Sequence, residues 1–84
     1  MFVDRDIAKK VLEKMLRKEY IGARHTAYEN AYKGFPKHLA GEARKVTDNL
    51  IRENLIIRKQ TAYGLQISLN QFKMDEIENR IRDP

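Results

Sequence analysis

The sequence predicts a mainly α-helical domain with one small β-hairpin, which is an α+β fold class. Apolar residues recur at helical spacing from Ile7 to Leu16. A second helical segment, Gly41 to Asn54, runs directly into the apolar start of Leu55–Gln60, and Leu65–Leu69 alternates apolar and polar residues. A period of about 3.6 residues indicates an amphipathic helix, and a period of two residues indicates a half-buried strand. The sequence shows no linker or repeat, so we expect one domain over residues 1–84.

Composition favours a folded, soluble protein of the cytoplasm. Apolar residues make up 42% of the chain, enough to offset the entropy lost on folding. No apolar run approaches the roughly 20 residues of a membrane span, and the N-terminus meets charges too early for a signal peptide. The absence of cysteine excludes disulfides and thiolate zinc sites, and it fits a reducing compartment. We therefore expect a cytoplasmic protein that makes no contact with membranes.

The N-terminal third is expected to hold two helices. Asp4 or Asp6 can cap the first helix, which should end near Glu19, and Tyr20-Ile21 is expected to be a short extended segment. Thr26 and Glu29 have the spacing of a capping box, in which a hydroxyl and a carboxylate each satisfy a free backbone donor. A second helix should therefore run from about residue 27 to residue 33 and stop at Gly34.

The third helix is predicted over residues 41–53, after an irregular first turn at residues 36–40. Val46, Leu50 and Ile51 are spaced for burial on one side. Gly41 weakens a continuous helix from Pro36, because a glycine inside a helix costs about 1 kcal/mol relative to alanine. Asn54 suits the end of the helix, since asparagine tolerates the left-handed conformation.

A hairpin and a last helix complete the expected fold. Ile56-Ile57 begins the first strand, the turn falls at about residues 61–64, and Leu65–Leu69 forms the second, antiparallel strand. Asn70 is expected to cap a helix over residues 71–82. Its apolar stripe of Met74, Ile77 and Ile81 has two possible partners. It can pack on the first helix to close the core, or it can pair with the same stripe of a second copy in a homodimer.

Positive charge is concentrated in the middle of the chain. The net charge is +5, and the segment from Arg24 to Lys59 carries eight basic and four acidic residues. Four of the five net positive charges therefore lie in this segment, which favours a polyanionic partner there.

This order of elements resembles the winged helix-turn-helix fold. The residues that carry the resemblance are Val46, Leu50-Ile51 and Asn54-Leu55-Ile56, followed by the hairpin at Lys59–Leu65. The segments Gly34–His38 and Thr61–Gln66 are also similar to small archaeal winged-helix proteins of no established function. The resemblance implies a three-helix core, a two-stranded wing, a C-terminal helix and a third short strand at Tyr20-Ile21. One departure is the segment from Gly34 to Ala40, which is longer than the usual three- or four-residue turn.

The resemblance implies binding to double-stranded DNA, as in a transcriptional regulator or a chromatin-associated factor. A recognition helix over residues 41–53 would enter the major groove, and the wing over residues 56–69 would lie on the adjacent backbone or minor groove. Arg44 and Asn49 are candidate base readers, because arginine can fork onto guanine and asparagine onto adenine. The candidate phosphate ligands are Lys37, His38, Lys45, Arg52 and Lys59. Arg58 and Tyr63 would add contacts from the wing.

Other readings of the sequence remain open. Glu42 can pair with Lys45 and Asp48 with Arg52, which would make the charged side of the helix an ordinary solvated surface. That balance of charge also suits a non-catalytic protein–protein interaction module. We expect no enzyme activity and no cofactor, because the chain has no glycine-rich phosphate loop, no cysteine nucleophile and only one serine, Ser68. Two histidines, His25 and His38, are too few for a metal site without a further ligand.

Overall fold

The computed structural model describes residues 4–82, which form three α-helices, two 3₁₀-helices and a three-stranded antiparallel sheet. The α-helices are α1 (Asp4–Arg17), α2 (Lys37–Arg52) and α3 (Met74–Arg82), and the 3₁₀-helices are η1 (Tyr28–Ala31) and η2 (Gln71–Lys73). The strands are β1 (Thr26–Ala27), β2 (Ile56–Thr61) and β3 (Gly64–Leu69). The α+β class predicted from the sequence is confirmed. Within residues 4–82, no helix is both long and apolar enough to cross a membrane.

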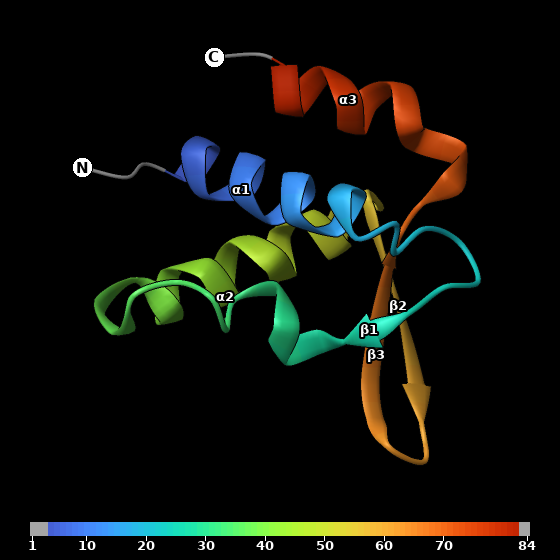
Figure 1. Ribbon diagram of the computed structural model, residues 1–84, viewed down its shortest axis with the longest axis horizontal. Coiled ribbons are helices and arrows are strands. Elements are labelled where there is room, and N and C mark those ends of the chain that lie inside the picture. The colour runs from blue at the N-terminus through green and yellow to red at the C-terminus, as the bar shows by residue number, and fades with distance from the viewer. Residues whose placement is uncertain (1–3, 83–84) are drawn as a thin grey trace.

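The helices lie against one end of the sheet, and the hairpin extends away from them (Figure 1). Helix α1 is packed between α2 and α3. Strand β3 is central in the order β1-β3-β2, so its partners are Thr26 of β1 opposite Ile67 and Ile56 of β2 opposite Leu69. The hairpin turns between Thr61 and Gly64, where the sequence predicts it, and Gly64 has a φ of 112° that favours glycine.

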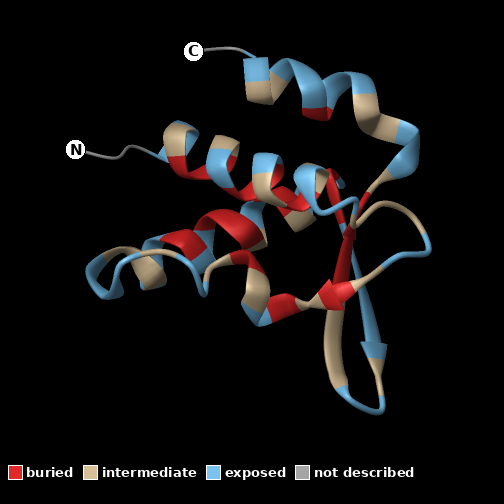
Figure 2. Ribbon diagram, in the orientation of Figure 1, coloured by how far each residue is buried: buried red, intermediate tan, exposed pale blue. Residues whose placement is uncertain are grey.

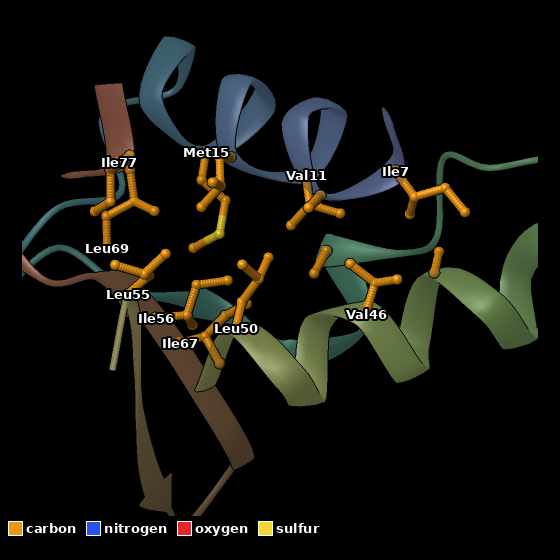
Figure 3. Packing of buried hydrophobic residues seen from close by; sticks show 14 of the residues in the cluster. Ile7, Val11, Met15, Val46, Leu50, Leu55, Ile56, Ile67, Leu69 and Ile77 are labelled. Carbon is orange, nitrogen blue, oxygen red and sulfur yellow. The ribbon is translucent and has the colours of Figure 1, made fainter. Parts of the chain in front are cut away.

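The core lies where α1, α2, α3 and the upper part of the sheet meet (Figures 2 and 3). Ile7 of α1 lies over Val46 of α2, Val11 lies between Val46 and Leu50, and Ile77 of α3 is fully buried near Leu69. Met74 and Ile81 are half-buried against the same cluster. The stripe on α3 thus closes the core, which is the first of its two predicted uses. Pairing this stripe with a second copy would require Ile77 to leave the core.

The end of α1 and the position of the third strand differ from the sequence prediction. Helix α1 ends at Arg17, and Glu19 takes a left-handed φ of 58°. Asp4 and Asp6 lie inside the first turn, where carboxylates complement the helix dipole, and the residue before Asp4 is outside the described residues. Tyr20-Ile21 does pair with the hairpin as expected, but only through an isolated parallel bridge between Ile21 and Leu69, so no regular strand forms there.

The third strand lies instead at Thr26–Ala27, so the predicted capping box and α-helix over residues 27–33 are wrong. The Thr26 hydroxyl accepts a hydrogen bond from Asn30 Nδ2 at 2.8 Å, and only the 3₁₀-helix η1 forms in this segment. Pairing of Thr26 with Ile67 holds the backbone extended. This long-range pairing outweighs the local capping pattern.

Helix α2 is continuous from Lys37, so the predicted irregular turn at residues 36–40 is also wrong. Gly41 lies within a regular helix, whose apolar side chains Ala43, Val46 and Leu50 are buried. That burial outweighs the weak helix propensity of one glycine. The predicted end is confirmed, since Asn54 has a left-handed φ of 63°. The Asn70 cap is confirmed as well, because its side chain accepts from the Phe72 amide at 3.0 Å, but the helix begins with η2.

Candidate nucleic-acid interface

A hollow of about 760 Å³ separates the last turns of α2 from the hairpin. The left-handed Asn54 turns the chain from α2 into β2 within a few residues, so the two elements diverge from a common corner. The hollow is lined by Tyr28, Arg44, Asp48, Ile51, Arg52, Asn54, Ile56, Ile57, Arg58 and Leu65. Four of the nine predicted interface residues belong to α2 between Arg44 and Arg52, but only two of those four border this hollow.

Three arginines line the hollow from its two sides. Arg44 and Arg52 are exposed residues of α2, two turns apart. Arg58 comes from β2, where side chains alternate between the two faces of the sheet. Ile56 is buried in the core on the face toward α2, so Arg58, two residues further on, lies on that same face beyond the core. The fold therefore brings together three guanidinium groups from two elements.

Tyr28 and Asp48 fix the surroundings of Arg44. The Tyr28 hydroxyl donates to Asp48 Oδ1 at 2.5 Å, and the Arg44 guanidinium carbon lies 6.0 Å from the centre of the Tyr28 ring. Burial raises the pKa of Tyr28, and its hydrogen bond to Asp48 raises that pKa further. The adjacent Tyr28 side chain also raises the pKa of Arg44. The hydroxyl therefore stays protonated as a donor, and the guanidinium stays charged.

The acidic residues of α2 are placed differently from the predicted pairs. Neither Glu42 with Lys45 nor Asp48 with Arg52 forms a salt bridge, although all four residues lie in the described part of the chain. Asp48 accepts from Tyr28, and Glu53 forms an ion pair with Arg80 of α3. Of the three carboxylates on α2 and at its C-terminal cap, Asp48 and Glu53 are thus engaged with residues outside the helix.

Asn49 does not join the arginines in the hollow. Its Oδ1 accepts a hydrogen bond from Arg52 Nη1 at 2.7 Å. Its side chain lines a different, smaller hollow with Asp4 and Arg5 of α1. The two predicted base readers, Arg44 and Asn49, therefore lie on different flanks of α2.

The remaining predicted residues are spread around the molecule. Strand alternation places Lys59 on the opposite face of the sheet from Arg58. Lys59 borders a second hollow that includes His25 and Phe72, and Arg58 lies at the edge of both hollows. Tyr63 is 95% exposed at the hairpin tip. Lys37 and His38 are exposed at the first turn of α2, about 20 Å along the helix axis from Arg52, and Lys45 is exposed between these ends.

Tyr28 is a residue of this site that no local sequence pattern predicts. It is 20 residues from Asp48 in the chain, and no local pattern links the two.

Lys14, outside this site, is a basic side chain with a structural role. Its Nζ donates to the Asn30 carbonyl at 2.6 Å, and burial together with the nearby positive charges lowers its pKa.

Comparisons with protein-family models, with curated proteins and with solved structures found no match to this chain. Within residues 4–82, no three histidine, aspartate or glutamate side chains gather closely enough to hold a metal ion. The interpretation of the site therefore depends on its geometry and its charge.

Proposed function

We propose that the protein is a winged helix-turn-helix domain that binds double-stranded DNA through α2 and the β2–β3 hairpin. The order α1, β1, η1, α2, β2, β3 supports this assignment, as does the sheet order β1-β3-β2 with the hairpin beside the end of α2. The observation that carries the proposal is the convergence of Arg44, Arg52 and Arg58 on one hollow. Such a domain would serve a transcriptional regulator or a chromatin-associated factor.

The geometry of a duplex explains why the hollow matters. A B-DNA major groove about 12 Å wide admits one α-helix, which is then flanked by both phosphate backbones. A hairpin beside that helix must cross one of these backbones, so the backbone passes between the two elements. In this protein the space between α2 and β2 carries three arginines and one carboxylate, Asp48, whose Oδ1 accepts from Tyr28. Arginine is well suited to phosphate, because its planar fork can donate two parallel hydrogen bonds.

Salt dependence of binding tests the proposal. Fluorescence anisotropy with a labelled 20-base-pair duplex of mixed sequence, at 50 and 200 mM NaCl, would give Kd at each salt. Three phosphate contacts predict a log–log slope of about −2.7, so Kd should rise about 40-fold between these concentrations. Arg44→Ala with Arg52→Ala should raise Kd at least about tenfold at 50 mM.

The control removes the same two charges elsewhere. Arg17 at the end of α1 and Arg82 at the end of α3 are exposed and lie outside the hollow. Arg17→Ala with Arg82→Ala should leave Kd within about twofold. No binding at 50 mM salt, or an equal loss in the control variant, would overturn the proposal.

A protein–protein interaction module is the second candidate, and an apolar surface that adjoins the arginine hollow favours it. Phe72 is 86% exposed and Ile57 is 41% exposed, on or beside the hairpin. Both border the hollow that contains Lys59 and His25. Exposed apolar side chains that lie together are typical of protein contacts. If this candidate were correct, Phe72→Ser would abolish the partner's binding, and the arginine variants would not affect it.

A further inference from the structure

Strand β2 forms one edge of the sheet. The strand order β1-β3-β2 gives β2 a single neighbour, and within residues 4–82 no segment pairs with its outer side. Four consecutive residues of this strand, Ile57 to Gln60, are exposed to solvent (Figure 2). An open edge strand is a template on which another extended chain can pair through its backbone.

The backbone groups on this edge are available for hydrogen bonds. Both backbone groups of Leu69 in β3 are bonded to the segment 20–22, on the side away from β2. Its partner Ile56 in β2 therefore belongs to a pair without hydrogen bonds, and such pairs alternate with bonded ones along an antiparallel ladder. By this alternation, Arg58 and Gln60 also direct their N–H and C=O groups away from β3. Those groups have no hydrogen-bond partner in the described part of the chain.

Positive charge selects the kind of chain that can pair with this edge. Neither β2 nor β3 carries a carboxylate, whereas Arg58 and Lys59 follow each other in β2. The longest antiparallel overlap of two β2 strands would place Arg58 opposite Arg58 of a second copy, and like charges at opposite positions destabilise a sheet. Acidic side chains at the same positions would form attractive pairs. The edge therefore disfavours a second copy and favours an acidic strand.

An apolar contact surface lies on the outer face of the same strand. Ile57 and Lys59 share the face of β2 that is turned away from the core, since Ile56 between α2 and the sheet is buried. Both border a hollow of about 520 Å³ that also includes the exposed Phe72. A side chain opposite Ile57 would lie beside this hollow and cover apolar surface there. A backbone ladder together with an apolar contact fits a peptide better than a phosphate backbone.

We infer that the outer edge of β2 binds an extended, acidic segment of another protein as an added antiparallel strand. The segment places an apolar side chain opposite Ile57 and carboxylates opposite Arg58 and Lys59, and its backbone bonds to Arg58 and Gln60. The inference does not depend on DNA binding by α2. It adds the chemical class of the partner to the second candidate function.

Titration of ¹⁵N-labelled protein with the peptide Ser-Thr-Thr-Glu-Glu-Val-Thr-Ser tests the inference. In antiparallel register this peptide sets its valine opposite Ile57 and its glutamates opposite Arg58 and Lys59. The amide signals of Arg58 and Gln60 should shift, and these amides should exchange more slowly with solvent because they gain hydrogen bonds. A peptide with lysine in place of both glutamates should bind at least about tenfold more weakly, from the loss of attraction and the new repulsion. Signal changes on α2 in place of β2, or equal binding of the lysine peptide, would overturn the inference.

A proline substitution separates strand pairing from simple attraction between charges. Gln60→Pro removes an N–H that points away from β3, so the hairpin keeps its ladder while the added strand loses a donor and meets the proline ring. The Kd of the acidic peptide should rise about tenfold or more, whereas Gln60→Ala, which keeps the N–H, should leave it within about twofold. Unchanged binding by Gln60→Pro with a native amide spectrum would refute the added strand. A parent protein that sediments as a dimer, with Gln60→Pro a monomer, would make the occupant a second copy and also refute it.

Reversal of charge tests the same contact without altering the backbone. Arg58→Glu with Lys59→Glu should lose the acidic peptide and gain the lysine peptide, so that the preference between the two peptides is exchanged. An unchanged preference would overturn the inference. Absence of peptide binding to the parent protein would refute the inference and leave the DNA proposal standing, whereas absence of DNA binding would leave the peptide result unaffected.

Discussion

Two residues other than glycine end helices in the left-handed conformation. Glu19 has a φ of 58° and Asn54 a φ of 63°. Each completes the same hydrogen-bonded motif, in which the next residue's amide reaches back to the helix. Leu55 N donates to Leu50 O at 3.1 Å, and Tyr20 N donates to Met15 O at 3.0 Å. Asparagine adopts this conformation readily, but for glutamate it costs on the order of 1 kcal/mol.

Glu19→Gly should therefore stabilise the protein. Glycine adopts the left-handed conformation without steric cost, and its extra freedom in the unfolded chain offsets part of the gain. We expect the free energy of unfolding to rise by about 0.5–1 kcal/mol and Tm to rise by a few degrees in a thermal melt. Lys18→Gly, one residue earlier, is the matched control and should lower Tm. A lower Tm for Glu19→Gly would show that its conformation is not strained.

Asp48 sets the charge of the hollow, and its neutralisation gives the second prediction. Asp48→Asn keeps an oxygen for the Tyr28 hydroxyl at a similar position, but it removes the one carboxylate that lines the hollow with the three arginines. If a phosphate backbone lies there, duplex affinity at 50 mM salt should rise about two- to tenfold, because a like-charge repulsion is removed. Asp75→Asn on α3 makes the same change of charge elsewhere and should have little effect. If Asp48→Asn left the affinity for duplex DNA unchanged, the phosphate backbone would not lie in this hollow.

At the site, sequence predicts the types of residue better than their grouping. The position of Asn49 on the flank of α2 follows from helical spacing to the buried Val46 and Leu50. The placement of Arg58 and Lys59 on opposite faces of the sheet follows from strand alternation once the buried Ile56 is known. The Tyr28–Asp48 hydrogen bond follows from neither, because only the packing of η1 against α2 brings the two residues together.

At the scale of elements, Gly41 and Gly64 can be compared directly, because both have room for a side chain but only Gly64 has a backbone conformation that favours glycine. Gly41 lies within α2, and a side-chain Cβ there would meet no atom within 4 Å. Gly64 also has open space, but its φ is 112°. Gly41→Ala should therefore raise the free energy of unfolding by about 1 kcal/mol, whereas Gly64→Ala should lower it by at least about as much. Chemical denaturation curves of the two variants would measure both effects. Destabilisation by Gly41→Ala would mean that α2 is not a regular helix at that residue.

The elements that sequence predicts well are those whose residues obey one period and carry their own end signals. Helix α2 with Asn54, and the hairpin with Gly64, meet both conditions. The segment from Tyr20 to Ala31 does not. Its Thr26–Glu29 pattern is typical of a helix start, yet the partner that decides its conformation is Ile67, about 40 residues away. Local capping is worth about 1 kcal/mol, so tertiary pairing can override it.

At the scale of the whole molecule, helix α3 and the proposed DNA surface lie on different sides. Helix α3 covers α1, whereas α2 and the hairpin border the hollow with the three arginines (Figure 1). No residue of α3 lines that hollow. Stability contributed by α3 and affinity for DNA should therefore be separable.

Ile77→Ala tests this separation. Ile77 is fully buried within the cluster that joins α3 to α1 and β3, so the variant should lose about 2–5 kcal/mol of unfolding free energy and about 10–30 °C in Tm. The exposed neighbour Glu78→Ala is the control and should melt close to the parent protein. At 10 °C, where circular dichroism can verify that the variant is folded, its Kd for duplex DNA should equal that of the parent. An unchanged Tm for Ile77→Ala would show that α3 does not contribute to the stability of the core. A raised Kd in the folded variant would place part of the DNA surface on α3.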